Sequence, residues 1–438
     1  MRVAVLGLWH LGTVTAAGTA AAGHRVLGWD PDLANLQRLA QGEPPLFEPG
    51  LAEQLKKGID CGLLSFEADL GKALDGAEII WVTHDTPVDD QDRADPEVVL
   101  RDVRAAIPLS GKGALFLVSS QLPAGSVGGL AAFAKSIGRD DLEFACSPEN
   151  LRLGQALKVF SDPDRLVCGV PSERAKGILS GFLSTIVERI EWMGVASAEM
   201  TKHAINAFLA TSVSFANEIA SVCERVGADA KEVERGLKTE RRIGPGAYLG
   251  PGQAFAGGTL ARDLAFLGEL GAEHGLTLPV LRAAKLSNDL HKGWVEDALI
   301  ERLGSLEGRK VALWGLAYKP GTDTLRRSSS LEIAGKLGRL GARVTAHDPQ
   351  VKKLPQEWQG ILSLCPTALS AVEKAHALVV ATPWPEYLEI PLGEALGLME
   401  RPLLVDPSGF LRERLGSLPL EYLSIGYARG LGKDASGA

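Results

Sequence analysis

Lys202 and Asn206 carry the side chains whose types and spacing most directly indicate chemistry. They stand four residues apart in a stretch with helical spacing, so both leave the same face of one helix. A lysine ammonium beside a reacting oxygen stabilises negative charge as it develops there, and an asparagine amide orients a hydroxyl group or a water molecule. An isolated pair of this kind is better interpreted as a solvated helix face, so the chemical interpretation needs support from other positions.

A second candidate is the sequence Gly-Leu-Trp-His-Leu-Gly at residues 7–12. Gly7 allows a tight turn, Gly12 allows a helix to pack on the preceding strand, and the N-terminus of that helix faces a pyrophosphate. Asp30 follows Gly12 by 18 residues, where a carboxylate holds a ribose 2′-OH and excludes a 2′-phosphate, which favours NAD over NADP. Trp9 departs from the pattern, since glycine normally occupies the middle position. A Rossmann-like fold that has lost its cofactor is therefore the alternative.

The elements that position these residues alternate between strands and helices. Short apolar stretches that end in turn residues predict strands of a parallel sheet at residues 2–6, 24–30, 78–83, 114–119 and 144–146. Residues 196–226 contain neither proline nor glycine and predict one long helix, with further helices to about residue 300. Strand patterns recur at residues 310–315, 343–348, 377–382 and 403–406.

The predicted fold class is therefore α/β, with two Rossmann-like doubly wound domains joined by a long central helix and a helical middle region. We expect an NAD-binding domain at residues 1–190, a central dimerisation and substrate domain at 191–300, and a nucleotide-sugar-binding domain at 301–438. The ligand sites are expected at the carboxyl ends of the strands.

Composition excludes several classes of protein. The chain of 438 residues is 45% hydrophobic and 23% charged, which is typical of a soluble globular protein. Its net charge of -8 argues against a nucleic-acid binder. Five cysteines without a C-x-x-C pair predict reduced thiols and no metal site in a cytoplasmic protein. The sequence shows no signal peptide and no apolar stretch long enough to cross a membrane.

Several further segments match, in the same order along the chain, the motifs of one known family. They are residues 42–51 (GEPPLFEPGL), Thr86-Pro87, 120–125 (SQLPAG), 147–154 (SPENLRLG), 163–165 (PDR), 242–244 (RIG), 248–252 (YLGPG) and 315–323 (GLAYKPGTD) followed by Arg326. This set resembles the UDP-glucose/GDP-mannose dehydrogenase family over nearly the whole chain. Members oxidise a nucleotide-sugar alcohol to an acid with two NAD, through an aldehyde held as a thiohemiacetal.

The resemblance implies a role for each matched position. The implied catalytic residues are Lys202, Asn206, Asp263, Glu149 and Thr259. The implied cofactor-binding residues are Gly7, Trp9, Leu11, Gly12, Asp30, Thr86, Gln121 and Arg326. The implied substrate-binding residues are Glu149, Leu151, Arg152, Lys202, Asn206, Arg242, Tyr248, Leu249, Gly252 and Lys319. NAD is the expected cofactor, a nucleotide sugar the expected substrate, and a homodimer the expected assembly.

The position of the nucleophile departs from the family pattern, which reads Gly-Tyr-Gly-Gly-Ser-Cys-Leu-Pro-Lys-Asp. Residues 254–263 here read Ala-Phe-Ala-Gly-Gly-Thr-Leu-Ala-Arg-Asp, so Thr259 falls on the catalytic cysteine. A shifted register would put Leu260 there, and neither register supplies a thiol. A threonine hydroxyl is a far weaker nucleophile without an adjacent base. Gln121 replaces the family threonine and Leu153 the second glutamate of its segment.

The leading hypothesis is an NAD-dependent nucleotide-sugar dehydrogenase, similar to UDP-glucose 6-dehydrogenase, that stops after one two-electron oxidation. A four-electron route through a hydrated aldehyde is an alternative. Another is a non-catalytic nucleotide-sugar-binding homologue or partner subunit, which Trp9 supports. A 3-hydroxyacid dehydrogenase is a third, and the segment at residues 315–323 argues against it. Cell-envelope polysaccharide biosynthesis and specialised sugar biosynthesis both fit as pathways.

Overall fold

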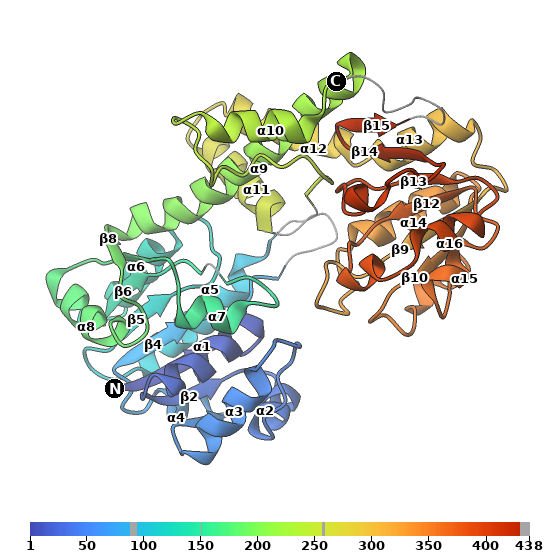
Figure 1. The fold of residues 1–438 in the computed structure, drawn as a ribbon. Helices are drawn as coiled ribbons and strands as arrows, with labels where there is room; N and C mark the ends of the chain where they lie inside the picture. Colours follow the sequence, from blue (N-terminus) through green and yellow to red (C-terminus); the bar gives the residue numbers. More distant parts are fainter. Residues whose placement is uncertain (88–93, 150, 256–258, 430–438) are drawn as a thin grey trace. The chain divides into compact units, whose positions relative to one another are not determined.

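The computed structural model describes residues 1–87, 94–149, 151–255 and 259–429. It divides into two compact units, Met1–Ile205 and Asn206–Ala438 (Figure 1). No helix in the described ranges is long and apolar enough to cross a membrane.

The first unit is built on an eight-stranded sheet in the order β3-β2-β1-β4-β5-β6-β7-β8. Its strands are β1 (Arg2–Leu6), β2 (Arg25–Trp29), β3 (Leu64–Glu67), β4 (Ile79–Val82), β5 (Leu115–Val118), β6 (Glu143–Cys146), β7 (Leu166–Gly169) and β8 (Ile190–Met193). All neighbours are parallel except β6 and β7. In the register, Leu6 lies opposite both Trp29 and Val82, so β1, β2 and β4 end together. The reversal of strand order between β1 and β4 is the switch point at which doubly wound sheets bind ligands.

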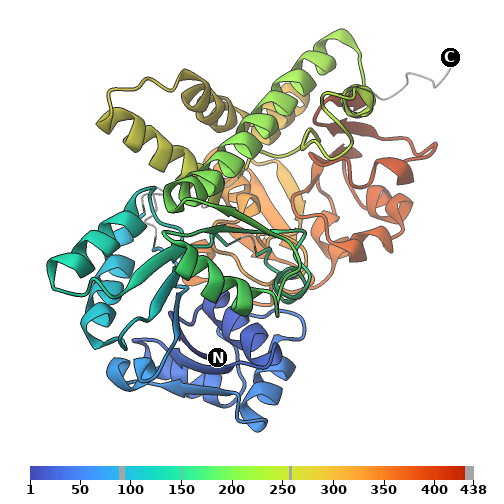
Figure 2. The same ribbon diagram turned by 90° about the vertical axis from the view of Figure 1, so that its left-hand side faces the viewer.

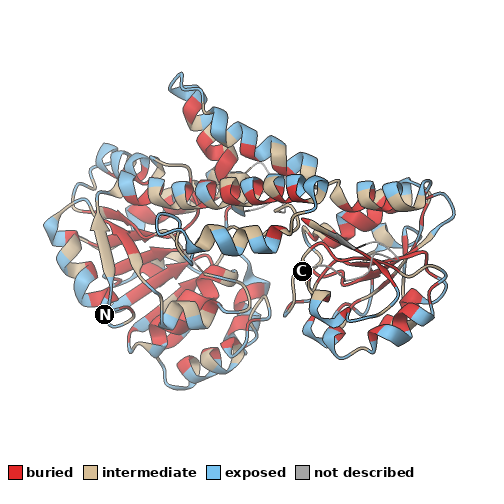
Figure 3. Ribbon diagram, turned by 45° about the horizontal axis from the view of Figure 1, so that its top comes forward, coloured by how far each residue is buried: buried red, intermediate tan, exposed pale blue. Residues whose placement is uncertain are grey.

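Both faces of this sheet are buried. In β1, Val3 and Val5 join one apolar cluster, and Ala4 and Leu6 join another. This explains why the strand is apolar throughout instead of alternating. The covering helices are α1 (His10–Ala21), α2 (Leu33–Ala40), α3 (Leu51–Asp60), α4 (Leu70–Leu74), α5 (Pro96–Ala106), α6 (Ser126–Ser136), α7 (Ala156–Ser161) and α8 (Glu173–Leu183). Figure 3 shows buried strands beneath helices that are buried on one side and exposed on the other.

Helix α1 packs closely because its residues are small. Every residue from Leu11 to Ala20 is buried. A Cβ at Gly18 would lie 2.3 Å from the ring of Phe160, so only glycine fits there. This close packing holds the N-terminus of α1 at the carboxyl end of β1.

The long helix α9 (Val195–Val226), predicted from the sequence, crosses from the first unit into the second (Figure 2). It is followed by α10 (Ala230–Thr239), α11 (Thr259–Glu273), α12 (Pro279–His291) and α13 (Trp294–Leu303). A seven-stranded sheet comes next, in the order β11-β10-β9-β12-β13-β14-β15. Its strands are β9 (Lys310–Trp314), β10 (Arg343–His347), β11 (Leu362–Leu364), β12 (Ala377–Val380), β13 (Leu403–Val405), β14 (Glu421–Ser424) and the antiparallel β15 (Tyr427–Arg429), with helices α14 (Ser329–Arg339), α15 (Ala368–Val372) and α16 (Leu392–Gly397). The predicted α/β class with Rossmann-like sheets and a long central helix is confirmed.

Candidate functional site

The turn after β1 has the geometry of a dinucleotide site. Gly7 has a φ of 86°, in the left-handed region that favours glycine, and its N–H donates to the carbonyl of Trp29 at 2.9 Å. The N–H of Leu8 donates to Oδ2 of Asp30 at 2.6 Å. The turn, the start of α1 and the carboxylate at the end of β2 therefore lie together, as the sequence predicted for Gly7, Gly12 and Asp30.

These residues fit NAD. The first turn of α1 carries no acidic side chain, so its backbone N–H groups and helix dipole favour a pyrophosphate. Trp9 does not disrupt the turn, because its carbonyl accepts the first helical hydrogen bond from Thr13 at 2.9 Å. Its indole is 42% exposed. The Asp30 carboxylate is only half-buried and can receive a ribose hydroxyl.

Two further predicted cofactor residues, Thr86 and Gln121, lie in the loops after β4 and β5. The hydroxyl of Thr86 donates to the carbonyl of Gln121 at 2.5 Å, and both residues are buried. His84 lies against the Gly7 turn, 3.6 Å from the Asp102 carboxylate. Burial lowers the pKa of His84 despite that carboxylate, so its imidazole is neutral at pH 7. A neutral, packed histidine agrees with a structural role.

Lys202 and Glu149 meet in a pocket of the first unit that Gln121 and Cys146 also line. The Lys202 ammonium lies 3.7 Å from Oε1 of Glu149, and Oε2 of Glu149 accepts the N–H of Leu151 at 2.8 Å. The backbone bond fixes the carboxylate, and the carboxylate orients the ammonium toward the pocket. An oriented cation beside a carboxylate is suited to stabilising an alkoxide while a proton leaves it.

Cys146 is the thiol in this pocket. It is 5% exposed at the end of β6. Burial raises the pKa of the Cys146 thiol well above its usual value, and the nearby Glu199 carboxylate raises it further. Since the thiolate is the reactive form, Cys146 behaves as a small buried apolar side chain.

Asn206 and Asp263 form a second pair, within the second unit. The Asn206 amide donates to Oδ2 of Asp263, and both residues are buried. Asp263 lies on α11, one turn after Thr259, the first residue of that helix. Thr259 is exposed. Asn206 and Lys202 lie four residues apart on α9.

The remaining predicted substrate and cofactor residues have varied surroundings. Gly252 is held through its backbone, by Asn217 at 2.9 Å and by His291 at 2.9 Å. Arg242 is exposed and pairs with Glu240 at 3.0 Å. Arg152, Tyr248 and Arg326 are exposed, Leu151, Leu249 and Lys319 are partly buried, and Leu11 is buried, lining a pocket with Glu149 and Leu151.

The second sheet repeats the turn of the first but uses its carboxylate differently. Gly315 has a φ of 95°, and its N–H donates to the carbonyl of His347, as Gly7 does to Trp29. Asp348 is only 2% exposed and accepts the N–H groups of Leu316 and Ala317 and the indole N–H of Trp384. Asp348 is therefore enclosed, whereas Asp30, which accepts the N–H groups of Leu8 and Asp32, is only half-buried.

Models of one family match the chain in three consecutive parts. They are the NAD binding domain at residues 1–187, the central domain at 196–290 and the UDP binding domain at 312–413 of the UDP-glucose/GDP-mannose dehydrogenases. The chain belongs to this family. Among its relatives, UDP-glucose 6-dehydrogenase of Pseudomonas aeruginosa is 34% identical, over 98% of both chains. UDP-glucose 6-dehydrogenase TuaD of Bacillus subtilis is 31% identical, over 97% of this chain and 93% of the relative.

Solved structures of related dehydrogenases have the same fold as this chain. A UDP-glucose dehydrogenase from Pyrobaculum islandicum superposes with a TM-score of 0.87 at 32% identity, over 98% of both chains. A UDP-D-ManNAc dehydrogenase from Pyrococcus horikoshii, at 24% identity and a TM-score of 0.85, has the same fold over 97% of this chain and 99% of its own. The chain is accordingly an NAD-dependent nucleotide-sugar dehydrogenase, an oxidoreductase that acts on a CH–OH group. The prediction of an NAD-dependent nucleotide-sugar dehydrogenase is thereby confirmed.

Sequence reasoning missed the function of Glu48. This glutamate is 3% exposed, and its carboxylate accepts the N–H groups of Gly154 and Ala156 at 2.8 Å and lies 2.9 Å from Nε2 of His10. It joins the start of α1 to the loop that carries Glu149. The only signal was its place in the segment GEPPLFEPGL, which identifies a motif but not a partner.

Proposed function

We propose that this dehydrogenase oxidises a nucleotide sugar of the UDP-glucose type by a single two-electron step and releases a carbonyl product. NAD supplies the hydride acceptor. The C–H bond breaks with its electron pair, the hydroxyl proton passes to the Glu149 carboxylate, and a C=O bond forms. Lys202 stabilises the alkoxide during this step. The observation that carries the proposal is the pairing of Lys202 with Glu149 in a pocket whose thiol is inert.

Two features of the residues near the proposed reaction support a route without a covalent intermediate. In the ungapped match to the family pattern, Thr259 takes the place of the cysteine, and a threonine hydroxyl is a far weaker nucleophile than a thiol. The buried Cys146 is a poor substitute because burial raises the pKa of its thiol. Without a thiohemiacetal, the carbonyl product is not held for a second oxidation.

The assignment of binding residues extends the resemblance. We assign the cofactor to Gly7, Trp9, Leu11, Gly12, Asp30, Thr86, Gln121 and Arg326, and the substrate to Glu149, Leu151, Arg152, Lys202, Asn206, Arg242, Tyr248, Leu249, Gly252 and Lys319. Asn206, Asp263 and Thr259 join Lys202 and Glu149 as catalytic residues. We also propose three functional domains, at residues 1–190, 191–300 and 301–438.

The number of NADH molecules formed per sugar consumed tests the proposal. The purified chain, given a panel of UDP- and GDP-sugars and excess NAD, is expected to yield one NADH per sugar and a carbonyl product by mass spectrometry. Cys146→Ser is expected to behave as wild type, since its thiol takes no part. Two NADH and a uronate would contradict the single step. Loss of activity in Cys146→Ser would instead identify a thiol route.

We further propose that the chain forms a homodimer through α9 and α12. Phe208, Phe215 and Val222 are spaced by seven residues on α9 and are 68%, 46% and 58% exposed, so they form one apolar stripe. Leu286 and Leu290 on α12 are 62% and 72% exposed. A surface of this kind is typical of a protein interface.

Phe208→Glu is expected to turn the dimer into a monomer, because it puts a charge into the apolar stripe. Light scattering after size-exclusion chromatography measures the mass. Leu33→Glu, at a 59% exposed apolar residue of α2, is the matched control and should stay dimeric. A monomeric wild type, or a Phe208→Glu protein that stays dimeric, would refute this interface.

A further inference from the structure

Side chains from α9 and α12 hold the backbone of the segment Gly252–Phe255 from one side. Oδ1 of Asn217 accepts the N–H of Gly252 at 2.9 Å, and Nε2 of His291 bonds to its carbonyl at 2.9 Å. The amide of Asn288 makes two bonds to Phe255, accepting its N–H at 2.8 Å and donating to its carbonyl at 3.0 Å. Asn217 and Asn288 are each only 2% exposed. Such a segment has little freedom to move.

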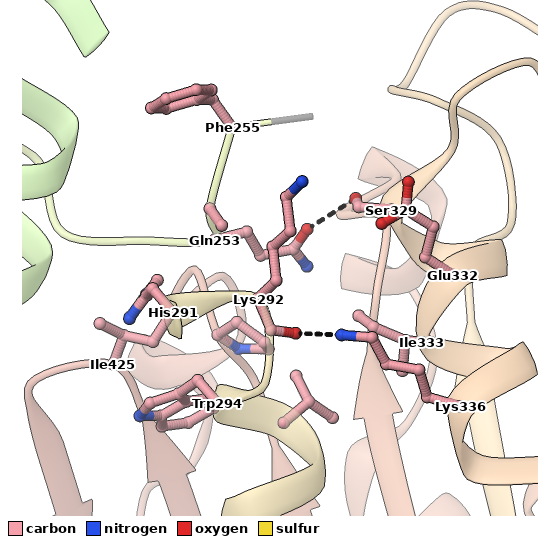
Figure 4. Close-up of a pocket in the computed structure, with 13 residues that line it drawn as sticks. Gln253, Phe255, His291, Lys292, Trp294, Ser329, Glu332, Ile333, Lys336 and Ile425 are labelled. Carbon is pink, nitrogen blue, oxygen red and sulfur yellow. Dashed lines mark hydrogen bonds between the residues drawn. The ribbon is translucent and has the colours of Figure 1, made fainter. Parts of the chain in front are cut away.

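The side chain of Gln253 joins the same segment to α14 and to the loop after β12, and Figure 4 shows its bond to Ser329, the first residue of α14. Its Nε2 donates to the carbonyl of Ala381 at 2.9 Å, and its Oε1 accepts the hydroxyl of Ser329 at 3.1 Å. Ala381 directly follows β12, and the next residue, Thr382, donates to the carbonyl of Ala317 at 2.7 Å. Gln253 therefore reaches the carboxyl ends of β9 and β12, where the order of this sheet reverses and a ligand is expected.

The other end of the segment, at Phe255, contacts α11, the helix that carries Asp263. Phe255 packs on the apolar cluster of Ala207, Ala210, Leu264 and Leu267. Leu264 and Leu267 lie on α11, which begins at Thr259 and carries Asp263. The bonds from Asn288 fix Phe255 and, through its ring, the position of α11 against α9.

We propose that Asn288 and Gln253 are positioning residues with separate effects on the reaction. Asn288 sets the place of α11, and with it the pair Asn206–Asp263, so it governs kcat. Gln253 sets the place of the segment relative to the switch point of the second sheet, so it governs the KM of the nucleotide sugar. The inference rests on the proposed function, which assigns Gly252 to the substrate and Asp263 to the chemistry.

Steady-state kinetics of Asn288→Ala and Gln253→Met test this separation. Asn288→Ala is expected to lower kcat by about 30-fold and to change KM by less than about threefold, since small misplacements of reacting groups cost rate. Gln253→Met keeps the shape of the side chain but loses both bonds. It is expected to raise KM by about tenfold and to leave kcat within about threefold.

Ser214→Ala is the matched control. Its hydroxyl bonds to the carbonyl of Ala284 at 2.8 Å and so also joins α9 to α12, but it does not touch the segment. It should lower the melting temperature without changing kcat or KM. Should Asn288→Ala not fold, Asn288→Asp keeps the acceptor for Phe255 N–H, loses the donor, and is expected to show the same selective loss of kcat.

Titration with UDP alone separates this inference from the proposed function. Gln253→Met should bind UDP about tenfold more weakly than wild type, and Asn288→Ala should bind it as wild type does. Equal changes in kcat and KM for both variants, or variants indistinguishable from Ser214→Ala, would overturn the inference. A wild-type chain that binds UDP but oxidises no nucleotide sugar would overturn the proposed function. In that case, the UDP affinities of the variants and the hydrogen exchange of the Phe255 backbone amide test the inference without any measurement of activity.

Discussion

Lys202→Met is expected to lower kcat by about 10³-fold while NAD and UDP still bind. The ammonium of Lys202 lies 3.7 Å from Glu149 in the pocket of the first unit. In the proposed reaction it is the cation that faces the developing alkoxide. Loss of one such preorganised group costs about 10² to 10³ in kcat. Methionine has nearly the same length and packs like the lysine stem, so the charge is the main change. Initial rates at saturating NAD and nucleotide sugar measure the effect.

Two controls distinguish lost chemistry from lost structure. Lys202→Arg keeps a cation, but its planar fork cannot place the charge as the ammonium does, so partial activity is expected. Lys176→Met removes a 40% exposed lysine that pairs with Glu173 on α8, and it should leave kcat unchanged. A loss of less than tenfold in Lys202→Met, or an equal loss of NAD affinity, would show that Lys202 does not stabilise the reacting oxygen.

The fold could be predicted from the sequence because its strands and glycine turns are local patterns. Gly7 and Gly315 each follow an apolar stretch, and each has the positive φ that such a turn requires. The long helix was equally visible, since no proline or glycine interrupts residues 195–226. Local patterns also located Asp30, because the carboxylate follows the second strand directly.

The functions of buried polar residues could not be predicted in the same way. Glu48 bonds to Gly154, 106 residues away, and Asn217 bonds to Gly252, 35 residues away. No sequence periodicity predicts such pairs, because a single buried carboxylate or amide does not recur at a regular spacing. The two sheets show the same limit. Asp30 and Asp348 directly follow equivalent strands, but only Asp348 is fully buried, where it also accepts the indole N–H of Trp384.

Gly12→Ala is expected to weaken NAD binding by about 10²-fold. A Cβ at Gly12 would lie 1.7 Å from the carbonyl oxygen of Gly7 and 2.8 Å from the hydroxyl of Thr83. Neither neighbour is the flexible end of a long side chain, so the turn and the start of α1 must separate. The added methyl also strains a packed interior, which costs about 1–3 kcal/mol of unfolding free energy. Fluorescence titration with NADH and thermal unfolding measure the two effects.

Gly128→Ala separates the specific clash from the general effect of replacing a helical glycine. Gly128 lies in α6, where an added Cβ would have no atom within 4 Å. This variant should bind NADH as wild type does and gain up to about 1 kcal/mol in stability, because alanine favours the helix. If Gly12→Ala loses stability but keeps its NADH affinity, the pyrophosphate does not lie at the N-terminus of α1. The exposed indole of Trp9 would then mark a changed path of the cofactor across this turn.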